Sequence, residues 1–302
     1  MPNSDLTRRR LLTRGLTVAG AGLLAPSTLV ACSRTEVGTG AAKQDTLKKI
    51  KKQGYVTIGF ANERPYGYKD GDKITGQAPE LHRAIWKTLG IKDVRGKVVS
   101  FDGLIPGLKA NQFDAVAAGM YITPERCQEA AFSEPEYRMP EAFLVRKGNP
   151  KKISDYKSLI TQKAVMGTLS GAVEVGYAKG SGVKKIQTYD DVLTGREAVG
   201  SGRIDAFAGT SLTLRTSLKD APSDKFEVTE GFFPVVDGEE QPTSGASVFR
   251  VGDTSILDAY NEGLAKLKES GELLEILKPF GFTEEEMPSE EDTAEKLCGK
   301  GS

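Results

Sequence analysis

An arginine follows a predicted strand in a position suited to binding an anion. The run FDAVAAGM (residues 113–120) predicts a strand of small residues, Gly119 among them, that would let a ligand approach the backbone closely. The next residues predict a helix start, with Thr123 as N-cap and Pro124 as the first helical residue. Arg126 then lies on the first turn, facing the strand end, and its guanidinium offers two parallel N–H donors to a carboxylate. We expect Arg126 to bind a carboxylate; the alternative is a surface arginine.

Three aromatic residues, Tyr66, Phe101 and Tyr121, each come directly after a predicted strand. Ligands of open α/β sheets bind beyond the carboxyl ends of the strands. Any one of these rings alone is more simply explained as core packing. Three rings at one end of one sheet predict an aromatic box, because each ring face attracts a cation by about 0.5–2 kcal/mol.

Two glutamates lie beside these features. Glu63 precedes Tyr66 by three residues, and Glu174 opens a predicted helix in the second half of the chain. A carboxylate accepts N–H bonds from a cationic ligand and balances its charge. Each glutamate alone would be an ordinary solvated residue, so it is their positions that make them candidate ligand contacts.

The first 31 residues have the features of an export signal. Four arginines precede an apolar run, residues 16–31, that is too short for a comfortable membrane span. The run TRRRLL resembles a twin-arginine signal, and LVAC, ending at Cys32, resembles the lipobox of bacterial lipoproteins. We expect a diacylated Cys32 to anchor the protein to the outer face of the cytoplasmic membrane through a polar tether, residues 32–44. The alternative is an ordinary secretory signal with a chance cysteine.

The charge balance limits the class of partner. The 302 residues carry 41 Lys and Arg against 41 Asp and Glu. Because residues 1–31 hold four arginines and one aspartate, the exported part is slightly acidic. This balance argues against a nucleic-acid partner.

Two cysteines remain beyond Cys32 in a chain expected in an oxidising compartment. Cys127 and Cys298 either form a disulfide, which would attach the acidic C-terminal tail to the domain that contains Arg126, or stay as two buried thiols. The single histidine, His82, is expected to be solvated or to flank the apolar stripe of its helix. With one histidine and scattered cysteines we expect no metal and no cofactor.

Beyond residue 44, short β-rich runs alternate with helical patterns, which indicates α/β layers. The segment 108–119 resembles 198–209, and 142–149 resembles 246–253. The simplest explanation is two similar lobes, with the second inserted into the first. The expected parts are a first lobe of residues 45–143 and 246–282, a second lobe of residues 144–245, and a tail of residues 283–302.

The element order and four segments resemble the polar amino-acid family of ABC-transporter solute-binding proteins: GFANERPYGY, FDGLIPGLKANQFDAVAAGMYITPERC, AFSEPEY and AFLVRKGN. Within that family, NERPYGY and GMYITPERC are similar to the ectoine/hydroxyectoine-binding branch. The resemblance implies a periplasmic-binding-protein-like type II fold, in which two parallel or mixed sheets, joined by two hinge strands, close over a ligand. It also implies a membrane permease as partner and no enzymatic activity, and we expect a monomer.

The resemblance also assigns roles to positions of this chain. Arg126 matches the family's carboxylate-binding arginine, and backbone N–H groups at Tyr121 and near Val173 would complete that site. Where the family usually has an aspartate for the α-ammonium of an amino acid, this chain has Thr210. The expected ligand is therefore a small zwitterion with a diffuse cation, ectoine or hydroxyectoine, whose ring N–H groups would bond Glu63 and Glu174.

Two other functions stay open. The ligand could be another zwitterionic or cationic amino acid or a betaine, although a quaternary ammonium has no N–H for the glutamates. The fold also hosts dehydratases of cyclic carboxylates, in which Glu63 or Glu174 would be a general acid or base. No nucleophile motif, metal cluster or second histidine accompanies them.

Overall fold

The computed structural model describes residues 45–299. The predicted export signal, the lipidation site at Cys32 and the tether therefore lie outside the described residues. No helix within the described range is long and apolar enough to cross a membrane.

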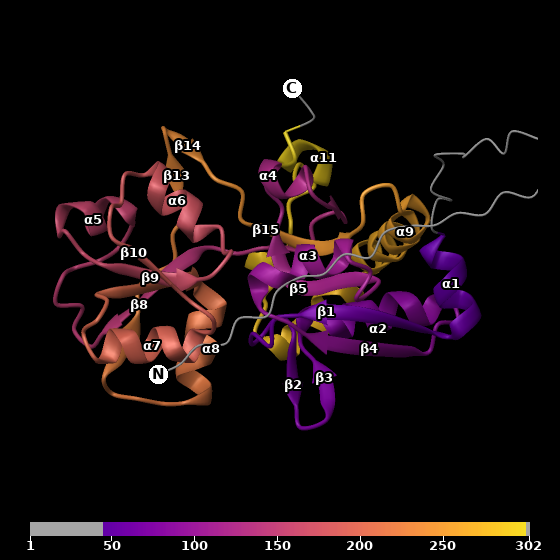
Figure 1. Ribbon diagram of the computed structural model, residues 1–302, viewed down its shortest axis with the longest axis horizontal. Coiled ribbons are helices and arrows are strands. Elements are labelled where there is room, and N and C mark those ends of the chain that lie inside the picture. Colours follow the sequence, from indigo (N-terminus) through magenta and orange to yellow (C-terminus); the bar gives the residue numbers. More distant parts are fainter. Residues whose placement is uncertain (1–44, 300–302) are drawn as a thin grey trace, which may run out of the picture. The chain divides into compact units, whose positions relative to one another are not determined.

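The first lobe is built on a mixed six-stranded sheet (Figure 1). Its order is β4-β1-β5-β15-β6, with β7 also paired to β15. Strand β1 is parallel to β4 and β5, whereas β15 is antiparallel to β5, β6 and β7. The strands are β1 (Tyr55–Phe60), β4 (Asp93–Val98), β5 (Ala115–Tyr121), β6 (Ala131–Phe132), β7 (Tyr137–Arg138) and β15 (Ser244–Phe249).

The second lobe is built on a five-stranded sheet of order β10-β9-β11-β8-β12. Strands β9, β10 and β11 are parallel, and β8 is antiparallel to β11 and β12. The strands are β8 (Glu141–Arg146), β9 (Met166–Leu169), β10 (Ile186–Tyr189), β11 (Ala206–Thr210) and β12 (Phe226–Val228). Two hairpins complete the strands: β2 (Tyr68–Asp70) with β3 (Lys73–Thr75), and β13 (Val235–Val236) with β14 (Glu239–Glu240).

The sheet pairing changes the expected lobe boundaries by a few residues. Residues 141–143, expected in the first lobe, belong to β8 of the second sheet, and residues 244–245, expected in the second lobe, belong to β15 of the first sheet. The chain therefore crosses between sheets just before Glu141 and just before Ser244. The apolar part of each strand could be predicted from the sequence. The first residues of each strand include polar ones, so their place in the strand could not be predicted.

The two helix starts expected from the sequence, at Pro124 and Glu174, are confirmed. The helices of the first lobe are α1 (Thr46–Gln53), α2 (Gln77–Thr88), α3 (Leu104–Lys109), α4 (Pro124–Cys127), α9 (Thr254–Ser270) and α10 (Glu272–Leu277), and those of the second are α5 (Tyr156–Thr161), α6 (Glu174–Gly180), α7 (Val192–Gly200) and α8 (Ser211–Asp220). Short 3-10 turns are η1 (Phe101–Gly103), η2 (Lys278–Phe280) and η3 (Glu284–Glu286), and α11 (Ala294–Leu297) lies in the tail. Phe101, expected directly after a strand, is instead the first residue of η1, because β4 already ends at Val98.

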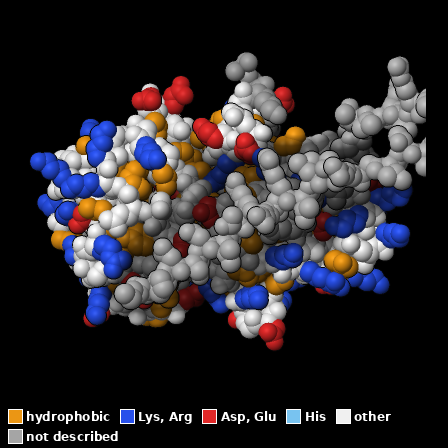
Figure 2. Space-filling model, viewed as in Figure 1, with side chains coloured by type: hydrophobic (Ala, Val, Ile, Leu, Met, Phe, Trp, Pro, Cys, Tyr) orange, Lys and Arg blue, Asp and Glu red, His pale blue; other side chains and the backbone are white. Residues whose placement is uncertain are grey.

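Both faces of the central strand β5 are buried, which explains its continuous run of small apolar residues. Ala115 and Ala117 face one core, which holds the apolar side chains of α2 and α9. Val116 and Ala118 face a second core, which includes Leu104 and Leu108 of α3. The outer surface differs from these cores: hydrophobic side chains on the visible face lie between charged ones (Figure 2).

His82 is buried in the first lobe, so the expectation of a solvated side chain is wrong. Its Nε2 atom is 2.9 Å from Ser247 Oγ, and its Nδ1 atom accepts a hydrogen bond from Trp86 Nε1 at 2.9 Å. Burial lowers the pKa of His82 to about 3, so the ring is neutral. These partners give the histidine a structural place in the core.

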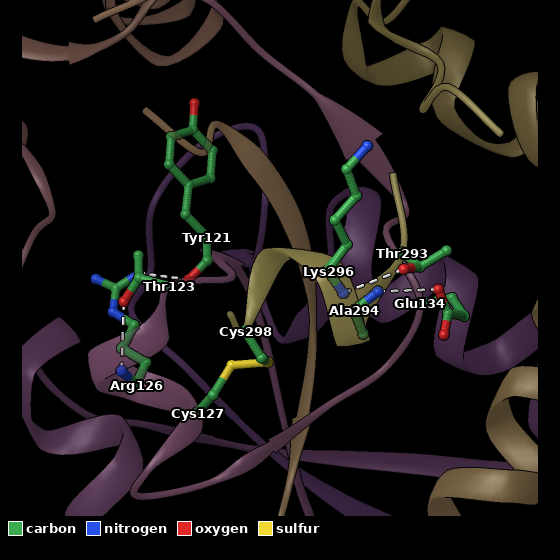
Figure 3. The surroundings of a disulfide bond; sticks show 9 residues. All are labelled: Tyr121, Thr123, Arg126, Cys127, Glu134, Thr293, Ala294, Lys296 and Cys298. Atoms are coloured by element: carbon green, nitrogen blue, oxygen red, sulfur yellow. Dashed lines mark hydrogen bonds between the residues drawn. A yellow bond between two sulfur atoms is a disulfide. The ribbon is translucent and has the colours of Figure 1, made fainter. Parts of the chain in front are cut away.

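A disulfide joins Cys127, at the end of α4, to Cys298, directly after α11 (Figure 3). The backbone N–H of Ala294 also donates to Glu134 Oε2 at 3.1 Å. Leu297 packs against the α3 side of the first lobe's core. The C-terminal tail is thus attached next to the short helix that carries Arg126.

Replacing Cys298 with serine should lower the free energy of unfolding by about 2–4 kcal/mol, because the bond spans a separation of 171 residues and restricts the unfolded chain. Urea unfolding followed by circular dichroism measures this change. A reducing agent should bring the wild-type protein to the stability of the variant and leave the variant unchanged. Equal stability of the two oxidised proteins would contradict the prediction.

Candidate functional site

A pocket lies between the two lobes and is lined by residues of both. About 450 Å³ of space free of protein atoms lies within its lining, part of it open to solvent. The structure brings all nine residues predicted to bind ligand to this pocket: Glu63, Tyr66, Phe101, Gly119, Tyr121, Arg126, Val173, Glu174 and Thr210.

Helix α4 positions Arg126 at the pocket. Thr123 caps the helix by accepting the N–H of Arg126 at 3.3 Å, and Pro124 is the first helical residue (Figure 3). The guanidinium donates to Tyr121 O at 2.8 Å and to Gly171 O of the second lobe at 3.0 Å. A guanidinium has five N–H donors, so three remain for a ligand. Burial lowers the pKa of Arg126 and the nearby Glu174 carboxyl opposes this shift, so the group stays positively charged.

The three predicted rings line the pocket in different ways. Tyr66 and Tyr121 are almost fully buried and belong to the first lobe's core while also reaching the pocket. Tyr66 stacks on Tyr137 with ring centroids 5.3 Å apart, and Tyr121 donates its hydroxyl hydrogen to Met139 O at 2.9 Å. Phe101 is half-buried, and its ring centroid is 5.5 Å from Cζ of Arg126. Two of the rings therefore serve both core and pocket.

Only glycine fits at position 119, because the ring of Tyr66 occupies the space that a side chain would need. Its φ of +61° lies in the left-handed region, and a Cβ built on it would overlap the Tyr66 ring. Its carbonyl accepts the hydroxyl hydrogen of Tyr137 at 2.7 Å. The glycine thus allows Tyr66 to lie against β5 at the pocket.

Glu63 is held by a tight loop and reaches across to the second lobe. Its backbone forms two hydrogen bonds with Gly67, at 2.9 and 3.0 Å. Its Oε1 atom accepts the hydroxyl hydrogen of Thr213, on α8, at 2.8 Å. Removal from water raises the pKa of Glu63 to about 7; the bond from Thr213 opposes this shift, and the charge of Glu174 adds to it.

Glu174 and Val173 lie at the start of α6. Val173 occupies the N-cap position and Glu174 is the first helical residue, so backbone N–H groups that lack intrahelical acceptors are close to the pocket. Burial raises the pKa of Glu174, while its own backbone N–H and the positive charge of Arg126 oppose the shift. The helix start therefore presents a buried carboxyl group beside the guanidinium.

Thr210 is already engaged in two hydrogen bonds. It is the N-cap of α8, where its hydroxyl oxygen accepts the N–H of Thr213 at 3.2 Å. The hydroxyl of Tyr66 lies 3.0 Å from the same oxygen and links the two lobes. This position carries no charge, so a ligand ammonium would find no carboxylate here.

Sequence reasoning missed several lining residues. Thr213 follows Thr210 by one helical turn, and this spacing could have predicted that Thr213 also lines the pocket. The apolar lining residues of the second lobe have no sequence pattern that separates them from core residues. These additional lining residues are Leu169, Ala172, Val192, Phe207, Ala208, Gly209 and Thr213. Over residues 45–299, no group of three or more His, Cys, Asp or Glu side chains is placed to hold a metal ion.

Replacing Gly119 with alanine should displace Tyr66 and weaken ligand binding, in addition to a stability loss of about 1–3 kcal/mol. Gly90→Ala is the matched control, because Gly90 also has a positive φ of +79° but no atom within 4 Å of its Cβ position. Thermal unfolding and calorimetric titration measure both effects. Equal losses in the two variants would show that Gly119 has no special relation to the site.

Removing the Tyr66 hydroxyl should remove the hydrogen bond to Thr210 that joins the two lobes. Tyr66→Phe is expected to weaken ligand affinity by about 2- to 10-fold, which corresponds to one neutral hydrogen bond. Tyr189→Phe is the control, since its hydroxyl bonds Gln187 within the second lobe. An unchanged affinity in Tyr66→Phe would mean that the bond to Thr210 does not contribute to the bound state.

The chain is similar in sequence to a family of bacterial proteins. The model of the bacterial extracellular solute-binding proteins, family 3, matches residues 56–283. A probable amino-acid ABC transporter periplasmic-binding protein of Sinorhizobium fredii is 35% identical over 260 residues, covering 84% of this chain and 86% of the relative. A probable histidine-binding protein of Campylobacter jejuni is 27% identical over 272 residues, covering 90% and 98%.

Solved structures agree with this likeness. The crystal structure of EhuB in complex with hydroxyectoine superposes with a TM-score of 0.76 at 34% identity, covering 84% of this chain and 98% of that one. The ancestral amino acid-binding protein AncCDT-1, described as a precursor of cyclohexadienyl dehydratase, superposes with a TM-score of 0.68 at 28% identity. The match covers 78% of this chain and 99% of that one. The two-lobed fold, the cleft and the matched span together place the chain in the bacterial extracellular solute-binding proteins, family 3.

Proposed function

We propose that this protein binds ectoine or hydroxyectoine in the cleft and delivers it to the membrane permease of an ABC importer of the amino-acid type. The observation that carries the proposal is one pocket that combines a guanidinium with N–H groups left for a ligand, three aromatic rings and two carboxyl groups. These groups match a carboxylate at one end of a small ring and a diffuse N–H cation at the other.

The carboxylate of the ligand would bind Arg126. Two of its N–H groups already donate to Tyr121 O and Gly171 O, which fixes the plane of the guanidinium. The remaining donors suit a carboxylate, and a charge-assisted bond in a partly desolvated pocket is stronger than one in water. Backbone N–H groups at the start of α6 would add to this end of the site.

The cationic end of the ligand would lie among the rings and the glutamates. Glu63 and Glu174 approach the pocket from different lobes, so an amidinium with two N–H groups could bond both. Thr210 supplies no charge and is bonded to Tyr66, which disfavours a compact α-ammonium. A betaine has no N–H to satisfy either glutamate.

The comparisons support a ligand of this type without selecting it. The hydroxyectoine complex of EhuB is similar over most of the chain, yet other relatives are named for histidine, arginine and cystine binding. The alternative ligand is therefore another zwitterionic or cationic amino acid. The pocket composition at Thr210 is what favours ectoine over these.

Ligand-driven closure would provide the transport signal. Several hydrogen bonds already cross between the lobes, among them those from Arg126 to Gly171, from Thr213 to Glu63, from Ser170 to Asp102, and between Tyr66 and Thr210. A ligand that contacts both lobes stabilises this closed arrangement because it binds the open one less well. Export by the N-terminal signal, possession of a lipid anchor at Cys32 and a monomeric state complete the proposal.

A thermal-shift screen over compatible solutes and amino acids tests the ligand. At about one hundred times the dissociation constant, the bound solute should raise the melting temperature by roughly 5–10 °C. Ectoine or hydroxyectoine should give the largest shift, and calorimetry should give the affinity. No heat with either solute but clear binding of an amino acid would overturn the ligand assignment.

Arg126→Ala should lower the affinity for the carboxylate ligand by at least about 30-fold, since it removes the charged partner of a buried carboxylate. Arg95→Ala is the control, because Arg95 lies on β4 and stacks on Tyr55 away from the pocket. Calorimetric titration of both variants measures the difference. Unchanged affinity in Arg126→Ala would place the carboxylate elsewhere.

Two observations favour the enzyme alternative. Glu63 and Glu174 have raised pKa values, as general acids do. AncCDT-1, an amino acid-binding protein similar to this chain, is described as a precursor of cyclohexadienyl dehydratase. Prolonged incubation followed by NMR should return the bound solute chemically unchanged. A new product would establish turnover.

A further inference from the structure

Glu141 is a buried carboxyl group that the ligand site described above does not use. It is the first residue of β8, directly after the chain crosses to the second lobe, and it has no solvent exposure. Its backbone is fixed by two hydrogen bonds to Phe232, at 2.8 and 2.9 Å. Neither of its carboxyl oxygens has a hydrogen-bond donor among the described residues.

A second buried glutamate shows that this state is unusual for the protein. Glu136, in the first lobe, accepts hydrogen bonds from Ser247, Tyr260 and Gln77 at distances of 2.6–3.0 Å. Buried carboxyl groups normally find such donors, because an unpartnered one is costly. Glu141 therefore needs another explanation.

Glu174 supplies that explanation. Its carboxyl group lies within hydrogen-bond reach of Glu141, and its Oε2 atom also lacks a donor among the described residues. Two ionised carboxylates are both acceptors and repel one another, so they can bond only if one holds a proton. Glu174, unlike Glu141, lines the ligand pocket.

The surroundings favour the proton on Glu141. Six ionisable groups face the pair from the neighbouring elements: Glu63, Tyr66, Tyr121, Arg126, Tyr156 and Tyr177. The only cation among these six is Arg126, which acts on Glu174. Tyr121 donates its hydroxyl hydrogen to Met139 O at 2.9 Å. Its hydroxyl also lies close to Glu141 and partly opposes the rise in the pKa of that carboxyl group.

The pKa directions agree with this geometry. Burial raises the pKa of Glu141 well above its ordinary value, and the charge of Glu174 raises it further. Burial also raises the pKa of Glu174, but Arg126 and the backbone N–H of Glu174 favour its charged form. Glu141 is thus the better proton holder of the two.

We propose that Glu141 sets the charge of the ligand site: it holds the proton of a hydrogen-bonded carboxyl pair with Glu174, so that the pair presents one negative charge to the ligand. This deepens the proposed function and rests on it only for the identity of the ligand. With Arg126 at one end, the pair adds a single negative charge at the other, beside Glu63, and this arrangement suits a ligand with one carboxylate and one cation. Glu141 is a positioning and specificity-determining residue, because it acts through Glu174.

Two reciprocal substitutions, Glu141→Gln and Glu174→Gln in the full-length chain, test the proton without any ligand. An acid whose pKa is raised by folding lowers stability as pH rises above the unfolded value of 4.5. Glu141→Gln removes this loss, so its melting temperature should exceed that of the wild type by an amount that grows by about 3 °C or more between pH 5 and pH 7. Glu174→Gln should keep the wild-type slope, since the buried Glu141 remains, and exposed Glu239→Gln is the surface control.

Ligand affinity then separates the two roles. With ectoine as the probe, Glu174→Gln should weaken binding at least about tenfold, because it removes the charge, whereas Glu141→Gln should stay within about threefold, because its amide can still donate to Glu174. A pH-independent difference in melting temperature for Glu141→Gln, or equal affinity losses in both variants, would overturn the proposal. If ectoine fails to bind at all, the proposed function fails while the melting-temperature comparison still decides the state of Glu141.

Discussion

The positive charge of Arg126, half-buried between the lobes, is the interaction on which the cleft depends. A guanidinium removed from water must be hydrogen-bonded and paired with negative charge. Otherwise the free-energy cost of desolvation exceeds the stabilisation that packing contributes. The first lobe supplies the carbonyl of Tyr121, and the second supplies the carbonyl of Gly171 and the carboxyl group of Glu174. Neither lobe alone therefore supplies all the hydrogen-bond acceptors and the negative charge around this guanidinium. Its interactions favour the arrangement in which the two lobes are close together.

The aromatic residues of the pocket also contribute to the core of the first lobe. Tyr66 and Tyr121 are core residues of the first lobe whose edges reach the pocket, and Gly119 leaves room for one of these rings. A site built on packed rings keeps its shape when the ligand is absent, so little binding energy is spent on ordering it. The tail disulfide acts on the same lobe, since it attaches residue 298 next to α4. Fold stability and site geometry thus share residues.

Much of this arrangement could be predicted from local signals in the sequence. Thr123 and Pro124 predicted the start of α4, and the small residues of 113–120 predicted β5, so Arg126 could be placed at a strand end. What the sequence could not reveal depends on tertiary contacts. Glu141 looks like an ordinary polar residue before an apolar strand, and its burial follows from how β8 pairs with β11 and β12. His82 was misjudged for the same reason, because its partner Ser247 is distant in sequence.

The central claim is that the cleft holds a small zwitterion with its carboxylate on Arg126 and its N–H cation on the glutamates. A crystal structure of the protein with ectoine or hydroxyectoine tests this most directly. The account predicts the carboxylate within hydrogen-bond distance of the guanidinium, and ring N–H groups on Glu63 and Glu174 with the ring between Tyr66, Phe101 and Tyr121. A ligand bound in the reverse orientation, or a cleft that stays empty at saturating solute, would contradict it.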